Sequence, residues 1–434
     1  MKFLINLLVI VTLIAGLAIW IALPLIGVLI VAVVLALWLT LTRRGRQAIA
    51  VTKVGIASLP QRWGASSVIV IGIAGVVGVL VAMLAMGEGF KSTLNRTGSE
   101  DSAIILRGGS QAETNSVITR DQVPLIRSLA GIARDGEDRP LVSPELSQVV
   151  DLKTVADNTD ANVQLRGIGA EAWALRPNVE IVEGRRFESG LREMVVGRGA
   201  QGQFRGIAVG ETVRLGNQDW TVVGAFKSSD SHESELWADA EVVANTYNRG
   251  AFQSVTVKLQ EGDGLEQLKA AMAGDPRLKL DVQTTRSYYA SQSRQLTMII
   301  NILGTVIGAI MAIGAVFGAL NTMYAAVATR AREIATLRAL GFGSLPVTVS
   351  VIVESMALAL LGGVAGAAIS WLLFNGYSVS TLGAGFTQVA FQFQVSPPLM
   401  LQGLLIALTL GFLGGLLPAI RAARVPVTVA LRGA

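Results

Sequence analysis

The sequence predicts a membrane protein in which an α-helical bundle, made of four core spans and an N-terminal two-helix hairpin, carries a large α+β domain in water. Hydrophobic residues make up 51% of the chain and charged residues only 15%, which is typical of membrane proteins. A helix needs ~20 mostly apolar residues to cross a bilayer. Such runs occupy residues 3–41, 68–86, 296–326, 349–374 and 399–420, and about 200 mostly polar residues separate the second run from the third.

The positions of the basic residues predict the side of the membrane on which each segment lies. Lys and Arg near the ends of spans are retained in the cytoplasm. These residues gather in segments 43–62 and 330–338 and after residue 420, whereas the loop from Asn375 to Pro398 has no charged residue. We therefore expect a multi-pass protein with both termini in the cytoplasm, and with the large polar domain and the short loop on the other side.

The first apolar run is about twice as long as one span requires. Two helices within residues 1–42, folded back near Pro24, satisfy the charge rule and bring the total to six spans. A cleaved signal peptide is the alternative, but its apolar region is usually ~7–15 residues long, and hydrophobicity here continues to Leu41. Residues 43–65 mix basic and apolar positions, which favours an amphipathic helix along the cytoplasmic face before a span at 66–87.

The polar insert, residues 88–295, has the patterns of mixed α and β structure. Its two ends alternate strand and helix patterns, and its centre contains short strands and a hairpin around Gly216 and Asn217. We therefore expect a β-rich part inserted into an α+β part. The α+β part comprises residues 88–155 and 250–295, and the β-rich part comprises residues 156–249.

The helix that enters the membrane after the insert is predicted to begin in the aqueous domain. The segment RSYYASQSRQLTMIINIL from Arg286 passes from polar to apolar without Gly or Pro, so one helix would join insert and membrane mechanically. Tyr288 and Tyr289 belong either to the membrane interface or to the core of the insert. The small-xxx-small spacing that lets helices pack closely, within the chain or across a dimer, recurs at Gly304, Gly308, Gly314 and Gly318.

No arrangement of residues in the sequence indicates catalysis, a bound metal or a bound cofactor. The chain has no cysteine, which excludes disulfides and thiolate chemistry. The string GEGFKST, Gly87 to Thr93, lacks the glycine that a phosphate-binding loop needs directly before its lysine. His232, the only histidine, lies among carboxylates in a polar loop, where we expect a solvated side chain.

A charged connector, residues 328–345, separates the third apolar run from the fourth. As a helix it places Ile334 and Leu337 on one side, and Arg332 and Thr336 on the other. Glycine and proline after the helical pattern then end it. A short helix of this kind can lie in a groove of a cytoplasmic partner while remaining tied to two spans.

Glu354 is the ionisable residue that the sequence places within the fourth apolar run. A charge inside a membrane helix is costly and by default indicates function. Here the carboxylate is about one turn from the cytoplasmic end, within reach of the connector's arginines. Two roles therefore remain open for Glu354: structural pairing that positions the connector, and a direct part in coupling.

The sequence around the connector resembles the FtsX-type domains of MacB-like ABC transporter permeases. Asn321, then TRAREIATLRALGFG from Thr329, then VIVES ending at Ser355 match a pattern of an asparagine late in one span, a basic connector, and a glutamate in the next span. LPAIRAARVPVTVALR, from Leu417, is similar to the C-terminal end of such domains. LPQRWGASSVIVIGIAGVVGVLVAMLAMGEGF, from Leu59, is similar to the span and exit before a MacB-type periplasmic core domain.

This resemblance implies a type VII, mechanotransmission ABC permease of the bacterial inner membrane, dimeric with itself or with a homologous permease. The insert would be periplasmic, with a porter-like α+β part and a sabre-like β-rich part, and residues 296–434 would form the FtsX-like domain. ATP and magnesium would bind a separate cytoplasmic ATPase, because the sequence lacks the fused ATPase domain of MacB. Nucleic acid is not among the implied partners.

The function that the resemblance implies is extrusion or release of a lipoprotein, lipid, peptide or drug, with a periplasmic adaptor or lipoprotein as a candidate partner. The alternative is an FtsX-like scaffold that activates a periplasmic cell-wall hydrolase. The permease itself would be non-catalytic. The implied ATPase contacts are Arg330, Arg332, Glu333, Arg338 and Gly341, and the implied bracing residues in the membrane are Asn321 and Glu354.

Overall fold

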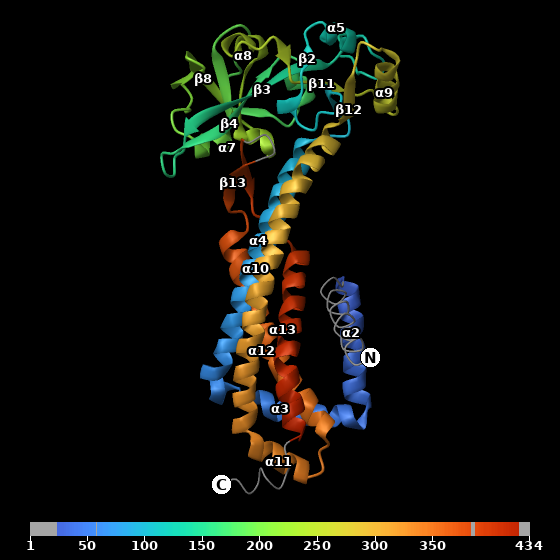
Figure 1. Cartoon of the computed structure of the whole chain (residues 1–434), viewed down its shortest axis with the longest axis vertical. Helices are drawn as coiled ribbons and strands as arrows, with labels where there is room; N and C mark the ends of the chain where they lie inside the picture. The colour runs from blue at the N-terminus through green and yellow to red at the C-terminus, as the bar shows by residue number, and fades with distance from the viewer. Residues whose placement is uncertain (1–23, 58, 383–386, 425–434) are drawn as a thin grey trace, which may run out of the picture. The chain divides into compact units, whose positions relative to one another are not determined.

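The computed structural model describes residues 24–57, 59–382 and 387–424, and these form two compact units (Figure 1). The membrane unit comprises Met1–Met86, Ile300–Asn375 and Gln394–Ala434. The sheet unit comprises Gly87–Ile299 and Gly376–Phe393. Each unit thus gathers segments that lie far apart in the sequence.

Four helices among the described residues are long and apolar enough to cross a membrane. They are α4 (Trp63–Thr97), α10 (Thr285–Thr329), α12 (Ser344–Phe374) and α13 (Pro397–Arg424). These helices agree with the four core spans expected from hydropathy. Helices α4 and α10 are longer than the expected spans, since their hydrogen bonding continues past the apolar residues into the polar sequence of the insert. The prediction that α10 begins in the aqueous domain is confirmed.

Glycine and serine bring the membrane helices into close contact. A Cβ on Gly411 of α13 would lie 2.5 Å from the Cβ of Ala359 in α12, which is too close for any residue but glycine. Nearby, Ser355 Oγ donates a hydrogen bond of 2.7 Å to the carbonyl of Gly411. Helix α12 also packs on α4, where a Cβ on Gly362 would lie 2.6 Å from the carbonyl oxygen of Val70.

The glycines of α10 divide into two pairs with different surroundings. A Cβ on Gly308 would meet Leu80 of α4 at 2.5 Å, and one on Gly304 would meet Met83 at 3.1 Å. Within the described chain nothing lies within 4 Å of a Cβ on Gly314 or Gly318. The first pair therefore packs inside the chain, and the packing role of the second pair stays a prediction.

The N-terminal region contains helices α2 (Leu25–Leu41) and α3 (Arg43–Ala57), bent by 97° where they meet, followed by the short 3-10 helix η1 (Pro60–Arg62). The first arm of the predicted hairpin falls in residues 1–23, outside the described residues. Helix α2 begins directly after Pro24, where the hairpin was expected to turn. Helix α3 covers the first part of the predicted amphipathic segment, residues 43–65, and it buries one face while leaving its cations exposed. Its position along the cytoplasmic face stays a prediction.

The sheet unit contains one ten-stranded mixed sheet with the order β12-β1-β11-β3-β4-β9-β6-β8-β5, and with β7 on β8. Short helices α5 (Gln122–Arg127), α6 (Ala172–Leu175), α7 (Arg198–Gln203), α8 (Ala240–Thr246) and α9 (Gly264–Gly274), and 3-10 turns η2 (Glu113–Asn115) and η3 (Ser231–Ser234), connect the strands. The strands are β1 (Ser102–Arg107), β3 (Val142–Lys153), β4 (Asp160–Ile168), β5 (Glu180–Gly184), β6 (Glu193–Gly197), β7 (Thr212–Leu215), β8 (Gln218–Lys227), β9 (Glu235–Asp239), β11 (Ser254–Lys258) and β12 (Leu280–Thr284); a separate pair contains β2 (Ile118–Thr119) and β10 (Ala251–Phe252).

Strand β3 joins the two ends of this sheet. Its residues 142–145 pair with β11, and its residues 146–153 pair with β4. The expected boundary between the α+β part and the β-rich part falls in the turn between β3 and β4, so the sheet crosses it without a break. The division therefore stays a prediction, whereas the hairpin around Gly216 and Asn217 is confirmed, with φ values of 57° and 62° at its turn.

The loop between α12 and α13 forms a β-hairpin of β13 (Ser378–Leu382) and β14 (Gln388–Gln392) and belongs to the sheet unit. The backbone N–H of Ala390 donates to Ser234 Oγ at 2.7 Å. Phe391 meets Phe90 of α4 edge to face, with ring centroids 5.5 Å apart. The GEGF string, residues 87–90, lies within helix α4. A Cβ on Gly89 would overlap the carbonyl of Gln392, so glycine at this position permits the close approach of the hairpin.

Candidate functional site

The charged connector forms helix α11, Ala331–Ala339, which is shorter than the predicted 328–345. Helix α10 continues to Thr329, and the chain turns at Arg330, which has non-helical φ and ψ of −100° and 8°. At the other end Gly341 has φ of +94°, a value that favours glycine, and its N–H donates to the carbonyl of Arg338 at 3.1 Å. Both ends of α11 are therefore set by local backbone geometry.

The two sides of α11 differ as the sequence predicts. Ile334 and Ala335 are buried, whereas Arg332, Glu333 and Thr336 are exposed. The exposed side therefore presents charged and polar groups to a partner, while the buried side holds α11 against its own chain.

Glu354 of α12 lies where four segments of the membrane unit meet. Its Oε2 lies 2.9 Å from Nη1 of Arg330, and its Oε1 lies 3.0 Å from Nη2 of Arg62. The carboxylate side chain is only 3% exposed. Arg330 also pairs with Glu333 of α11 at 3.0 Å. We call Arg62, Arg330, Glu333 and Glu354 the Glu354 cluster.

Gly55 of α3 completes the surroundings of this cluster. A Cβ at Gly55 would lie 3.1 Å from Oε2 of Glu354 and 3.5 Å from Nη1 of Arg330. Glycine therefore permits α3 to approach the ion pair closely. The site links the basic N-terminal segment, the start of α11 and the interior of α12.

The Glu354 cluster is balanced in charge, with two guanidinium groups and two carboxylates. Burying a charge is tolerable when each oxygen has a partner, and removal of one partner from a buried pair typically costs about 3–5 kcal/mol. The pairing with a connector arginine, one of the two roles left open for Glu354, is thus present in the structure. Its role in coupling stays a prediction.

Asn321, the other residue predicted to brace the membrane helices, makes none of the contacts described for this cluster. Asn321 is exposed on α10, and no side-chain hydrogen bond of Asn321 occurs among the described residues. Arg62 and Gly55 were not predicted, although Arg62 lay in a segment already noted as basic. Arg62 and Glu354 are 292 positions apart, so no local pattern could have joined them.

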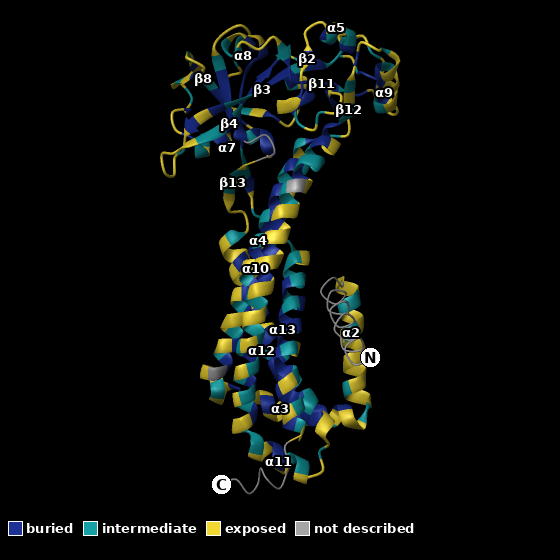
Figure 2. Cartoon of the chain, viewed as in Figure 1, coloured by how far each residue is buried: buried dark blue, intermediate teal, exposed yellow. Residues whose placement is uncertain are grey.

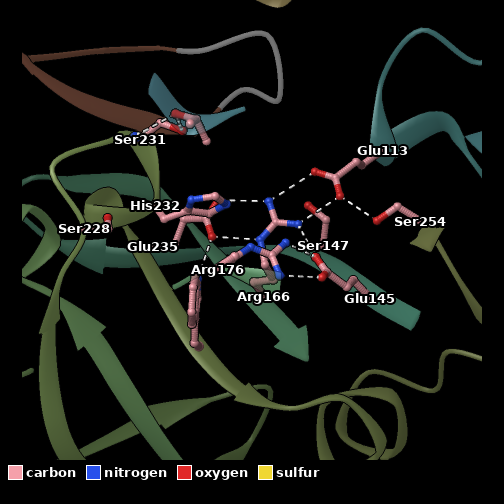
Figure 3. Close-up of polar contacts among 12 residues, drawn as sticks. Glu113, Glu145, Ser147, Arg166, Arg176, Ser228, Ser231, His232, Glu235 and Ser254 are labelled. Atoms are coloured by element: carbon pink, nitrogen blue, oxygen red, sulfur yellow. Dashed lines mark hydrogen bonds and ion pairs between the residues drawn. The ribbon is translucent and has the colours of Figure 1, made fainter. Parts of the chain in front are cut away.

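A second group of buried charges lies in the sheet unit (Figure 3). The guanidinium of Arg166 in β4 bonds Glu113 at 2.9 Å, Glu145 at 2.9 Å and Glu235 at 2.8 Å. Arg176 binds the same Glu145 with two bonds of 2.8 Å. All five side chains are at most 10% exposed. This group, which we call the Arg166 cluster, connects strands β3, β4 and β9.

The arginines of the Arg166 cluster keep Glu145 and Glu235 ionised. Burial by itself would raise the pKa of Glu145, but the charges of Arg176 and Arg166 outweigh burial and lower that pKa to about 2. The pKa of Glu235 is also lowered, because Arg166 and hydrogen bonds from Arg166 and Trp237 outweigh its burial. Every carboxylate is already engaged by arginine, which favours a structural role over acid–base chemistry.

The expectation that His232 is solvated is wrong. His232 in η3 is 2% exposed, because its ring packs edge to face against Trp237, with centroids 5.4 Å apart. Its Nδ1 lies 3.2 Å from Oδ1 of buried Asp230. Tyr288, for which interface and core remained open, is buried with Ile104 and Leu106 in the core of the sheet unit. No group of three potential metal ligands occurs in the part of the chain that the structure describes.

Two protein-family models match the chain, and together they cover most of both units. The MacB-like periplasmic core domain matches residues 66–274. The FtsX-like permease C-terminal domain matches residues 305–427, which include α11 and Glu354.

Curated relatives extend over most of the chain. It is 22% identical over 386 residues to an uncharacterized ABC transporter permease, YknZ, of Bacillus subtilis (strain 168), covering 82% of this chain and 92% of YknZ. It is 26% identical over 390 residues to the macrolide export ATP-binding/permease protein MacB of Pasteurella multocida (strain Pm70), covering 84% of this chain but only 56% of MacB.

Among solved structures, the periplasmic region of MacB from Actinobacillus actinomycetemcomitans matches with 15% identity and a TM-score of 0.33, over 46% of this chain and 95% of that one. The extracellular domain of the noncanonic ABC-type transporter YknZ from Gram-positive bacteria matches with 16% identity and a TM-score of 0.31, over 42% of this chain and 98% of that one.

Proposed function

Because the chain belongs to the MacB-like ABC transporter permeases with an FtsX-like C-terminal domain, we propose that it couples ATP hydrolysis by a separate ABC ATPase to movement of its sheet unit. The permease would sit in the bacterial inner membrane with both termini in the cytoplasm and the sheet unit in the periplasm. ATP and magnesium would be bound by the ATPase, and a second permease would complete a dimer.

The observation that carries this proposal is the Glu354 cluster. The exposed side of α11 offers Arg332 and Glu333 to an ATPase, and Glu333 bonds Arg330, which in turn bonds Glu354. A force on α11 would therefore act directly on the ion pair between Arg330 and Glu354 of α12. Gly341 fixes the end of α11, so that the short helix moves as one piece.

Covalent continuity supports transmission from the membrane unit to the sheet unit. Helix α10 runs from Thr285 to Thr329 without a break. The next residue is Arg330, which belongs to the Glu354 cluster. Helices α12 and α13 are joined through the β13–β14 hairpin, which belongs to the sheet unit. A shift of α11 would therefore reach the sheet unit through helices, without a substrate path across the membrane.

The work done would be extrusion or release of a lipoprotein, lipid, peptide or drug at the periplasmic side. The MacB relatives are named for macrolide export, which makes a macrolide a reasonable first probe. A periplasmic adaptor or lipoprotein would receive or deliver the cargo.

Purification of the tagged protein from its native membrane, with mass spectrometry of the associated chains, tests the proposal. We expect an ABC ATPase to co-purify, and its ATPase activity in nanodiscs to rise when the transported molecule is added. Recovery without any ATP-binding subunit would overturn the proposal. Activation of a co-purified cell-wall hydrolase, without stimulation by any cargo, would instead assign the FtsX-like scaffold function.

A further inference from the structure

We propose that α3 and the turn before it form a binding surface for anionic phospholipid headgroups. This inference is independent of the proposed coupling function. It rests on the apolar surface of α2, the bend between α2 and α3, and a row of cations that have no acidic partner among the described residues.

Helix α2 consists of apolar residues apart from Thr40. None of its residues is buried (Figure 2). Its large side chains are strongly exposed, for example Ile26 at 71% and Leu41 at 74%. Its 17 residues span about 25 Å, close to the ~30 Å hydrocarbon core of a bilayer. Acyl chains are therefore the surroundings that this helix requires.

The bend at Thr42 turns the chain from this apolar helix into α3 by 97°. The hydroxyl of Thr42 accepts a bond from the N–H of Gly45 at 2.9 Å and donates to the carbonyl of Trp38 at 2.8 Å. A side chain on Gly45 would overlap the backbone of Trp38 and Leu39, so glycine permits the tight turn. If α2 crosses the membrane, α3 runs along its surface.

The two faces of α3 have different partners. One face buries Gly45, Ala48, Val51 and Gly55, and α3 packs on α12. The remaining surface exposes Arg43, Arg44, Arg46 and Lys53. Among the described residues no carboxylate forms an ion pair with any of these four cations.

Phospholipid headgroups fit this surface better than a soluble anion does. The cations follow directly after a helix that needs acyl chains, so they lie at the level of headgroup phosphates. Val54 and Ile56 beside Lys53 are 51% and 43% exposed, and such apolar groups insert between lipids. Bound headgroups would hold α3 on α12, at the place where Gly55 meets Glu354.

Lipid selectivity of the full-length protein tests this proposal. The protein is reconstituted in phosphatidylcholine bilayers with trace spin-labelled phosphatidylglycerol or phosphatidylcholine, and the relative association constants are measured by electron paramagnetic resonance. We expect the wild type to prefer phosphatidylglycerol by at least about twofold, and high salt to weaken that preference. A variant with Arg43→Gln, Arg44→Gln, Arg46→Gln and Lys53→Gln should lose most of it.

The matched control removes four exposed cations of the sheet unit that have no ion pair in the described chain: Arg107→Gln, Arg214→Gln, Lys227→Gln and Lys279→Gln. It should keep the wild-type preference. If the α3 variant fails to insert, replacing its three arginines with lysine keeps the charge and should keep the selectivity. A wild type without preference for phosphatidylglycerol, or an α3 variant with unchanged preference, would overturn the proposal.

Discussion

The carboxylate of Glu354 lies 2.9 Å from the guanidinium of Arg330, the residue at which α10 has ended and α11 has not begun. This ion pair therefore connects the break between α10 and α11 to the interior of α12. A rotation of α11 that moved Arg330 by even one bond length would stretch the pair. Because Glu354 is 3% exposed, water cannot easily replace the lost partner.

The substitution Glu354→Gln should therefore weaken both stability and coupling. It leaves Arg62 and Arg330 without the buried carboxylate, at a cost on the order of 3 kcal/mol in the free energy of unfolding. Thermal unfolding in detergent and cargo-stimulated ATPase activity of the purified complex measure the two effects. For the stability measurement, the control Glu333→Gln alters a 61% exposed carboxylate and should cost less than about 1 kcal/mol.

Combining Glu354→Gln with Arg62→Gln distinguishes a specific pair from general loss of charge. We expect the double variant to be more stable than the sum of the single losses predicts, by about 1 kcal/mol or more. Strict additivity would show that Arg62 does not depend on Glu354 and would contradict the assignment of the Glu354 cluster.

The substitution Gly341→Ala should disturb the end of α11. Gly341 has φ of +94°, where a Cβ costs about 1 kcal/mol or more, so the last turn of α11 should unwind. Hydrogen exchange of the amides in residues 336–342 would report the change, and coupled ATPase activity should fall. The control Gly343→Ala has an ordinary extended backbone and its nearest neighbour 3.6 Å from the new Cβ, so it should behave like wild type.

Local sequence patterns predicted the four membrane helices and the hairpin around Gly216 and Asn217, because each follows from its own residues. Hydropathy located the four spans, and the absence of Gly and Pro after Arg286 predicted that α10 starts before the membrane. The alternation of buried and exposed positions on α11 followed from helical periodicity alone.

Local patterns could not predict contacts between segments that lie far apart in the sequence. His232 is buried because Trp237 folds over it, although its polar neighbours suggested solvent. The uncharged loop after α12 forms two strands that contact Ser234 through a hydrogen bond and Phe90 through an aromatic ring. Neither residue lies near the loop in the sequence. Arg62 reaches Glu354 for the same reason. In each case the contact forms only in the folded chain, so a local sequence pattern could not predict it.

The Arg166 cluster predicts how the stability of the sheet unit depends on pH. Arg176 and Arg166 overcome the effect of burial and lower the pKa of Glu145 from 4.5 to about 2. A pKa that is lower in the folded state gives stability that is present above pH 4.5 and is lost as the pH falls towards 2. The loss attributable to Glu145 is roughly 2 kcal/mol between pH 7 and pH 3, and roughly 3 kcal/mol once the pH is below 2.

Denaturant unfolding of the full chain, followed by tryptophan fluorescence at pH values between 7 and 3, measures this dependence. Glu145→Gln should be less stable than wild type at pH 7 and should lose less stability on acidification. The control Glu241→Gln removes an exposed acid that pairs with Arg120 and should show the wild-type acid dependence. An equal acid dependence in Glu145→Gln and wild type would show that this carboxylate is not held ionised by the arginines.

A disulfide between the β13–β14 hairpin and η3 would test whether the hairpin must move. The chain has no cysteine, so Ser234→Cys with Ala390→Cys introduces a single pair, at positions where Ala390 N–H and Ser234 Oγ are 2.7 Å apart. We expect the disulfide to form under mild oxidation and to suppress cargo-stimulated ATPase activity reversibly, because the hairpin joins α12 to α13 and would be fixed to the sheet unit. Ser234→Cys alone should be insensitive to oxidation. A cross-linked protein with full stimulated activity would show that the hairpin does not need to move relative to η3 during the cycle, and would contradict this expectation.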